Sequence, residues 1–159
     1  MSIRPILAHE SEAKVIQEAA QFLGVHLDVL RASTAAEIET AFDALEGLKA
    51  SGLVVAVDAF FTAQSEKIVK LAAEHKMPTV YGWRAFTEAG GLMSYAPNIA
   101  EGYRSVGILV GRILKGDKPA DLPVEQVTKI EFIVNLKTVK ALGLTVSLPL
   151  VGRANEVIE

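Results

Sequence analysis

A carboxylate and two aromatic rings stand directly after one short apolar segment of the chain. The segment Gly52–Val57 is a continuous apolar run, typical of a buried β-strand, and Asp58, Phe60 and Phe61 follow it. Ligands of open parallel sheets lie outside the carboxyl ends of the strands, so this turn could hold a small molecule. Alternatively, Asp58 caps the next helix and the rings are core. The sequence does not decide between these roles for Asp58 and Phe60, whereas we expect Phe61 in the core.

Two further strand ends carry similar side chains. Together with the first, these turns supply Asp58, Phe60, Phe61, Tyr81, Trp83, Arg84, Phe86 and Tyr95. Six of the ten aromatic residues fall in these three turns, a composition typical of a small-molecule pocket. Such a pocket predicts that Asp58 holds a ligand ammonium group and Arg84 a carboxylate. The alternatives are that Tyr81 and Trp83 belong to an interface and that Arg84 is a solvated charge.

The chain lacks the residues on which several classes of enzyme depend. The chain has no cysteine, and its three histidines, His9, His26 and His75, lie far apart without metal-ligand spacing. It also lacks glycine-rich phosphate-binding loops and a G-x-S-x-G elbow. We therefore expect no metal, no cofactor and no enzymatic activity. A small α/β enzyme that uses Asp58 as a base is the weakest of the functions considered.

Composition restricts the partners. Half of the 159 residues are hydrophobic, which suits one domain with a sizeable core. The net charge is −3 and no basic cluster is present, so we expect no binding to nucleic acid. No apolar run approaches the roughly 18 residues that a membrane helix needs.

The elements that position these residues alternate between helix and strand in the first half. Helical periodicity runs from Val15 to Leu23, from Thr34 to Leu48 after a capping box with Glu37, and over 62–75. The expected strands are Ile3–Leu7, Val25–Leu30, Gly52–Asp58 and the segment 77–83. This order predicts an α/β fold, a Rossmann-like parallel sheet flanked by helices.

The second half predicts a long amphipathic helix and a further strand. Asn98 and Glu101 form a capping box for a helix that ends near Lys115. The segment 129–135 alternates as a strand, a short helix follows it to residue 142, and we expect the tail to end as a helix. The apolar face of the long helix consists of Tyr103, Val106, Val110 and Ile113.

Four segments in this order carry a family resemblance: "DAFF" (58–61), "EAGGLMSY" (88–95), "RILKGDKPADLPVEQ" (112–126) and "NLKTVKALGLT" (135–145). From about residue 12 to its end, the chain resembles the C-terminal part of ABC-transporter substrate-binding proteins of the tryptophan- and tyrosine-binding type. The resemblance implies a type I periplasmic-binding-protein fold, whose two lobes close around a solute and deliver it to an ABC permease. It divides the chain into a Rossmann-like lobe, 1–92, and a crossover segment with C-terminal helices, 93–159.

The resemblance also implies roles for individual residues. It places Asp58, Ala59 and Phe60 in the ligand-facing loop of the second lobe. Tyr81 and Trp83 would line the neighbouring strand end, and Met93 to Tyr95 would lie in the crossover. With Arg84 from the pocket composition, the predicted ligand-binding residues are Asp58, Ala59, Phe60, Tyr81, Trp83, Arg84, Met93 and Tyr95, for a solute such as an amino acid.

The chain departs from the family in length. Members carry a leader and a complete first lobe that this sequence lacks, so we expect a truncated, one-lobe module. The apolar face of the helix that starts at Asn98 would then be uncovered, which predicts a homodimer. The family implies a periplasmic or lipid-anchored protein, whereas the sequence as given, without a signal, implies a cytoplasmic one. The alternative function is a stand-alone cytoplasmic ligand-sensing or regulatory domain of the same fold.

Overall fold

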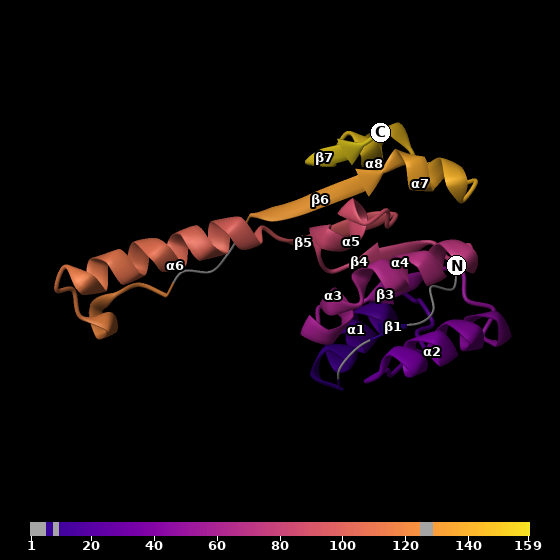
Figure 1. Cartoon of the computed structure of the whole chain (residues 1–159), viewed down its shortest axis with the longest axis horizontal. Helices are drawn as coiled ribbons and strands as arrows, with labels where there is room; N and C mark the ends of the chain where they lie inside the picture. The colour runs from indigo at the N-terminus through magenta and orange to yellow at the C-terminus, as the bar shows by residue number, and fades with distance from the viewer. Residues whose placement is uncertain (1–5, 8–9, 125–128) are drawn as a thin grey trace.

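The computed structural model describes residues 6–7, 10–124 and 129–159, which build one seven-stranded sheet (Figure 1). The strands are β1 Ile6–Leu7, β2 Val29–Leu30, β3 Leu53–Val55, β4 Thr79–Tyr81, β5 Met93–Pro97, β6 Ile130–Asn135 and β7 Glu156–Ile158. Their order in the sheet is β2-β1-β3-β4-β5-β6-β7. The described pairs are parallel except β5 with β6. This arrangement confirms the predicted α/β fold with a parallel-dominated sheet.

Two of the helices begin directly after the capping residues that the sequence predicts, Thr34 and Asn98. The helices are α1 Glu10–Phe22, α2 Ala35–Gly47, α3 Ala59–Ala63, α4 Ser65–Glu74, α5 Arg84–Glu88, α6 Ile99–Leu114, α7 Leu136–Ala141 and α8 Leu148–Val151, with a 3-10 turn at Pro119–Asp121. The Thr34 hydroxyl accepts a hydrogen bond from the N–H of Glu37 at 3.2 Å, and Asn98 accepts one from Glu101 at 2.9 Å. Each bond satisfies a donor that the first helical turn leaves free.

The main core lies between one face of the sheet and helices α2, α4 and α5. Alternate strand residues such as Leu53, Val55 and Tyr81 point to this face and are almost fully buried. The intervening residues, such as Val54, point to the other face, where Ile16 of α1 packs beside them. The sheet is thus a central layer with helices on both sides.

Two local predictions need correction. The helix expected over 62–75 begins earlier, because Asp58 caps it, and it is two helices that meet at Gln64. The tail ends as strand β7 and not as a helix. Its register is held by Asn155, whose N–H donates to the Phe132 carbonyl and whose side-chain oxygen accepts from the Phe132 N–H. The expected strand 3–7 is seen as β1, and residues 3–5 lie outside the described part.

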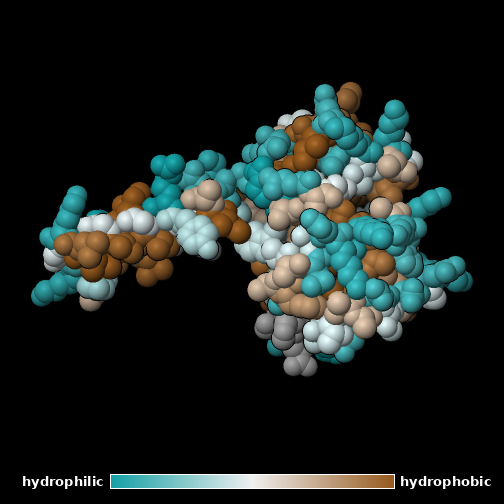
Figure 2. All heavy atoms as spheres, viewed as in Figure 1, coloured by the Kyte–Doolittle hydropathy of each residue, from teal (hydrophilic) through white to brown (hydrophobic). Residues whose placement is uncertain are grey.

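Helix α6 projects from the body of the molecule as an arm (Figure 1). None of its 16 residues, all of them described, is buried. Hydrophobic side chains cover much of the arm's visible surface (Figure 2), and Tyr103 is 74% exposed. The expected uncovered apolar face is therefore confirmed.

The sheet continues across residue 92, since β5 pairs with both β4 and β6. The expected division between 1–92 and 93–159 stays a prediction. In the described residues, every helix is too short or too polar to span a lipid bilayer.

Candidate ligand-binding site

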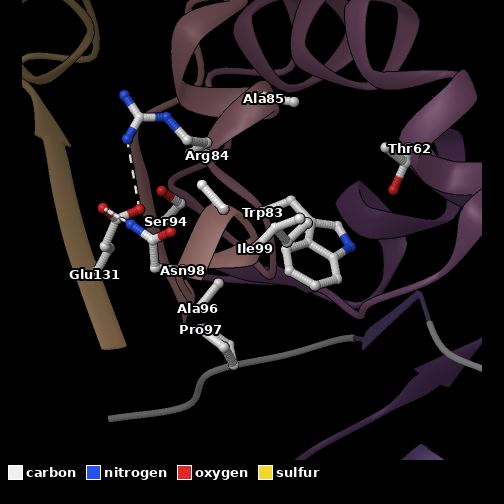
Figure 3. Close-up of a pocket in the computed structure, with 11 residues that line it drawn as sticks. Thr62, Trp83, Arg84, Ala85, Ser94, Ala96, Pro97, Asn98, Ile99 and Glu131 are labelled. Carbon is white, nitrogen blue, oxygen red and sulfur yellow. Dashed lines mark hydrogen bonds and ion pairs between the residues drawn. The ribbon is translucent and has the colours of Figure 1, made fainter. Parts of the chain in front are cut away.

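A pocket of about 370 Å³ lies at the carboxyl edge of the sheet, where β5 passes into α6 (Figure 3). Five elements meet there: α3, the start of α5, the end of β5, the start of α6, and β6. The side chains around it include Thr62, Trp83, Arg84, Ser94, Asn98, Ile99 and Glu131. This is the edge at which parallel α/β sheets bind their ligands.

One end of the pocket is largely apolar. The Trp83 indole lies beside Ile99, and Thr62 lies beyond it on α3 (Figure 3). The Thr62 hydroxyl donates to the Asp58 carbonyl at 2.7 Å, which fixes its rotamer. Trp83 is half-buried and also packs against the main core, so its ring is held in place on one side.

The other end is charged. The Arg84 guanidinium donates to Glu88 at 2.8 Å, to Glu156 at 2.9 Å and to Glu131 at 3.4 Å. The hydrogen bond to Glu88 raises the pKa of Arg84, desolvation lowers it, and Glu156 raises it further, so that it stays above its ordinary value. Arg84 is therefore charged at every working pH, and three glutamates from α5, β6 and β7 orient it.

Glu131 connects this charged end to the arm. Its Oε1 accepts a hydrogen bond from Asn98 Nδ2 at 2.5 Å, while Asn98 Oδ1 caps α6 (Figure 3). The antiparallel pairing of β5 with β6 places Glu131 opposite Ala96 at the pocket. Our sequence reasoning missed Glu131 because strand order and register are needed to bring it here; it read Asn98 only as a cap.

Of the predicted ligand-binding residues, Trp83 and Arg84 line this pocket. Asp58 lies nearby as the cap of α3, where its Oδ1 accepts from the N–H groups of Phe60 at 2.7 Å and Phe61 at 3.2 Å. Among the described residues, both capping hydrogen bonds thus go to Oδ1, one of the two carboxylate oxygens of Asp58. Ala59 is exposed at the start of the same helix.

The two phenylalanines after Asp58 differ in burial. Phe61 is 2% exposed in the core, as predicted. Phe60 is partly buried, and the centroids of the Phe60 and Phe61 rings lie 5.6 Å apart. Phe60 therefore packs from the edge of the core, and its role toward a ligand stays a prediction.

The structure places Tyr81 in the core. It is 1% exposed, and its ring stacks on Phe86 with the centroids 4.8 Å apart. Burial raises the pKa of the Tyr81 hydroxyl well above its ordinary value, and a hydrogen bond with Thr79 partly opposes the rise. The Tyr81 ring is therefore part of the core beneath the strand end, and its role toward a ligand stays a prediction.

Met93 and Tyr95 point to the opposite face of the sheet from the pocket. Successive strand residues alternate in direction, and Ser94 and Ala96 are the β5 side chains at the pocket. Tyr95 is 61% exposed and meets Phe132 edge-on with the ring centroids 6.3 Å apart. Sequence reasoning grouped these residues by segment, whereas the pleat separates them.

A parallel-dominated sheet with an aromatic and charged pocket at its carboxyl edge defines a small-molecule-binding α/β domain. Residues 7–158 match the model of the family described as ABC transporter substrate binding protein. The chain belongs to this family. It is 29% identical over 113 residues to the tyrosine-binding protein of Clostridioides difficile (strain R20291), an overlap of 70% of this chain and 32% of that protein.

Solved structures share the fold. A conserved domain protein from Vibrio cholerae O1 biovar El Tor superposes with a TM-score of 0.87 at 20% identity, over 98% of this chain and 54% of that one. The ABC domain from Streptococcus pneumoniae in complex with L-Trp superposes with a TM-score of 0.85 at 23% identity, over 99% and 55%. The chain thus spans about half the length of these structures and about a third of the tyrosine-binding protein.

Proposed function

We propose that the chain is a solute-binding module of an ABC importer and that its ligand is an aromatic amino acid. The observation that carries the proposal is the two-ended pocket, with the Trp83 ring at one end and the Arg84–Glu131 ion pair at the other. An aromatic amino acid has the same two ends, a ring and a zwitterion. The names of two similar proteins, one tyrosine-binding and one in complex with L-Trp, support this ligand class.

The ligand's charged groups would exchange with an existing ion pair. Arg84 offers a guanidinium to the ligand carboxylate, and Glu131 offers a carboxylate to the ligand ammonium. The present Arg84–Glu131 contact is the longest of the three Arg84 ion pairs, at 3.4 Å, and is the easiest of them to replace. Asp58, which the sequence also predicts as a partner of the ligand ammonium group, lies at the start of α3. In this proposal its carboxylate likewise attracts the ammonium group.

The ring of the ligand would pack on Trp83. Complete burial of an aromatic side chain removes about 150–250 Å² from water, worth roughly 4–6 kcal/mol before the cost of immobilising the ligand. Trp83 and Ile99 form one wall of such a site. We therefore expect weak affinity, with a Kd near about 0.1–1 mM, wherever this wall acts alone.

The proposal is a binding role without catalysis. The titratable side chains that line the pocket, Arg84 and Glu131, are ion-paired with each other and with neighbours. A nucleophile activated by a base would need a different set of contacts. A permease would be the macromolecular partner, and the periplasmic side of the membrane the place of action.

A thermal-shift screen tests the ligand class. A solute that binds only the folded chain raises its melting temperature with concentration. We expect L-tryptophan and L-phenylalanine at 5–10 times a Kd of about 1 mM to raise it by a few degrees, because RT ln(1 + [L]/Kd) is then about 1.1–1.4 kcal/mol. L-alanine and L-serine serve as controls that carry the same zwitterion without a ring. An equal shift with all four, or none with the aromatic pair, would contradict the proposal.

A further inference from the structure

The apolar end of the pocket contains two polar atoms, the Thr62 hydroxyl oxygen on α3 and the indole nitrogen of Trp83. Figure 3 shows Arg84, Trp83 and Thr62 in this order across the pocket, with the Trp83 nitrogen on the ring edge toward Thr62. A ligand whose zwitterion lies at Arg84 and whose ring packs on Trp83 would therefore bring the far end of that ring close to both atoms.

The Thr62 hydroxyl is oriented so that it can accept a hydrogen bond. Its proton is donated to the Asp58 carbonyl at 2.7 Å, one helical turn earlier. A hydroxyl oxygen also has two lone pairs, and no residue that the structure describes donates a hydrogen bond to this one. Because Thr62 lines the pocket, its lone pairs are available to a ligand that carries a donor.

The Trp83 side chain supplies a donor beside this acceptor. An indole nitrogen carries one N–H and accepts no hydrogen bond. Within the described part of the chain, the Trp83 N–H donates to no acceptor, Thr62 included. The ring packs against the main core, and this packing fixes the direction in which the N–H points.

A hydroxyl group at the far end of a ligand ring matches both atoms at once. It donates its proton to Thr62 Oγ1 and accepts the proton of Trp83 Nε1. An unsubstituted phenyl ring makes neither hydrogen bond, and an indole N–H makes only the one to Thr62. The two atoms thus distinguish aromatic rings by their polar group, whereas the apolar wall of Trp83 and Ile99 accepts all of them.

We propose that Thr62 and the Trp83 N–H determine the specificity of the pocket and select an aromatic amino acid with a phenolic hydroxyl, L-tyrosine, over L-phenylalanine. This inference rests on the proposed function, which places the ligand ring on Trp83 and the zwitterion at Arg84 and Glu131. It adds a third recognised group, the hydroxyl at the end of the ring.

The burial of the two residues sets the size of the preference. A site that encloses a substrate hydroxyl completely can reject the analogue without it by a factor of about 10⁴–10⁵. Thr62 and Trp83 are only partly buried, so water can bond to both atoms when the ligand hydroxyl is absent. We therefore expect L-tyrosine to bind about five- to tenfold more tightly than L-phenylalanine, the net effect of roughly one hydrogen bond.

The first experiment uses the fluorescence of Trp83, the only tryptophan of the chain. The chain is titrated with L-tyrosine, up to its solubility, and with L-phenylalanine, with excitation at the red edge of the indole band, where neither ligand absorbs appreciably. The Kd of L-tyrosine should be about five- to tenfold lower. Equal Kd values would overturn this inference and leave the proposed function standing. If neither amino acid binds, the proposed function fails and the inference fails with it.

The second experiment removes the acceptor. Thr62→Val keeps the shape of the side chain, and the Asp58 carbonyl keeps its hydrogen bond from the Thr62 N–H at 3.0 Å. We expect this variant to bind L-tyrosine at least threefold more weakly and to bind L-phenylalanine as the wild type does. Thr62→Ser retains a hydroxyl and should retain the preference for L-tyrosine.

Thr40→Val is the matched control for this substitution. The Thr40 hydroxyl donates in the same way to the Ala36 carbonyl, at 3.1 Å, on α2 outside the pocket lining. This variant should keep the ratio of the two Kd values seen in the wild type. Equal weakening of both ligands by Thr62→Val, or loss of the preference in Thr62→Ser, would overturn the role of the Thr62 hydroxyl.

The third experiment removes the donor. Trp83→Phe keeps a ring but lacks both the N–H and the fluorophore, so thermal shifts at equal ligand concentration replace the fluorescence. L-tyrosine should lose at least half of its advantage over L-phenylalanine in this variant. An unchanged advantage would overturn the role of the Trp83 N–H.

Discussion

A hydrogen bond between Asn98 and Glu131 joins the two segments that connect the arm to the sheet. Asn98 lies where the chain leaves β5 for α6, and Glu131 lies in β6, where the chain returns to the sheet. Asn98 Nδ2 donates to Glu131 Oε1 at 2.5 Å, and Asn98 Oδ1 accepts from the N–H of Glu101 at 2.9 Å. The Asn98 N–H also donates to the Lys129 carbonyl at 3.0 Å. One residue thus caps the arm, ties it to β6 and lines the pocket, so the direction of the arm and the shape of the site have a common cause.

Two substitutions of Asn98 should separate its cap from its tie to β6. Asn98→Ala removes both and should lower the free energy of unfolding by about 1–2 kcal/mol, measured by urea denaturation. Asn98→Ser keeps an acceptor for Glu101 but is too short to reach Glu131, so it should lose less than half as much. Equal losses in the two variants would show that the cap contributes nothing measurable.

Two substitutions of Asp58 should likewise separate its structural contribution, as the cap of α3, from its electrostatic contribution to ligand binding. Asp58→Ala removes the cap of α3 and should cost about 0.5–2 kcal/mol of stability. Asp58→Asn keeps the capping oxygen and should stay within about 0.5 kcal/mol of the wild type. If the carboxylate attracts the ligand ammonium group, Asp58→Asn should weaken L-tryptophan binding about tenfold, or about 1.4 kcal/mol. Unchanged affinity in a calorimetric titration would restrict Asp58 to capping.

Arg84 should matter for binding more than for stability. Its three ion pairs are exposed, so Arg84→Gln should change the free energy of unfolding by less than about 1 kcal/mol. The same change removes the proposed partner of the ligand carboxylate and should weaken L-tryptophan binding at least tenfold. Arg112→Gln, which breaks one exposed pair with Asp117 on the arm, is the matched control. A control that loses as much affinity as Arg84→Gln would rule out a specific role.

Tyr81 should make the chain sensitive to alkali. Burial raises the pKa of its hydroxyl, so above about pH 10 the unfolded chain releases this proton and the folded chain keeps it. Stability from this group is complete below pH 10 and falls as the pH rises, by up to ~1.4 kcal/mol per pH unit. Tyr81→Phe should lessen the decline between about pH 10 and 11.5 in urea denaturation. Tyr103→Phe, on the exposed face of α6, should leave it as in the wild type.

The elements with local signals could be predicted from the sequence. The capping pairs at Thr34 and Asn98 fixed the starts of α2 and α6, and the apolar run before Asp58 fixed β3. The tail could not be assigned in this way, because its strand depends on Asn155 bonding to the distant Phe132. An isolated "NEVIE" has no neighbour to pair with, and only the finished sheet provides one.

The sequence predicted at which edge of the sheet the site lies, but not which side chains point into it. The placement of Trp83 and Arg84 needed only the end of a strand. The burial of Tyr81 and the outward direction of Tyr95 depend on which face of the sheet each residue occupies, and one residue of register decides that. Glu131 required the antiparallel pairing with β5, a contact 47 residues away from Arg84 along the chain.

A calorimetric titration of the full chain with L-tryptophan tests the central claim most directly, with Trp83→Ala and Phe22→Ala as variants. Phe22 is 91% exposed at the end of α1 and lies outside the pocket lining, so its removal controls for the loss of a ring. We predict a saturable heat for the wild type and Phe22→Ala, and at least tenfold weaker binding, about 1.4 kcal/mol, for a folded Trp83→Ala. No saturable heat at millimolar ligand, or an unchanged Kd in Trp83→Ala, would contradict the account.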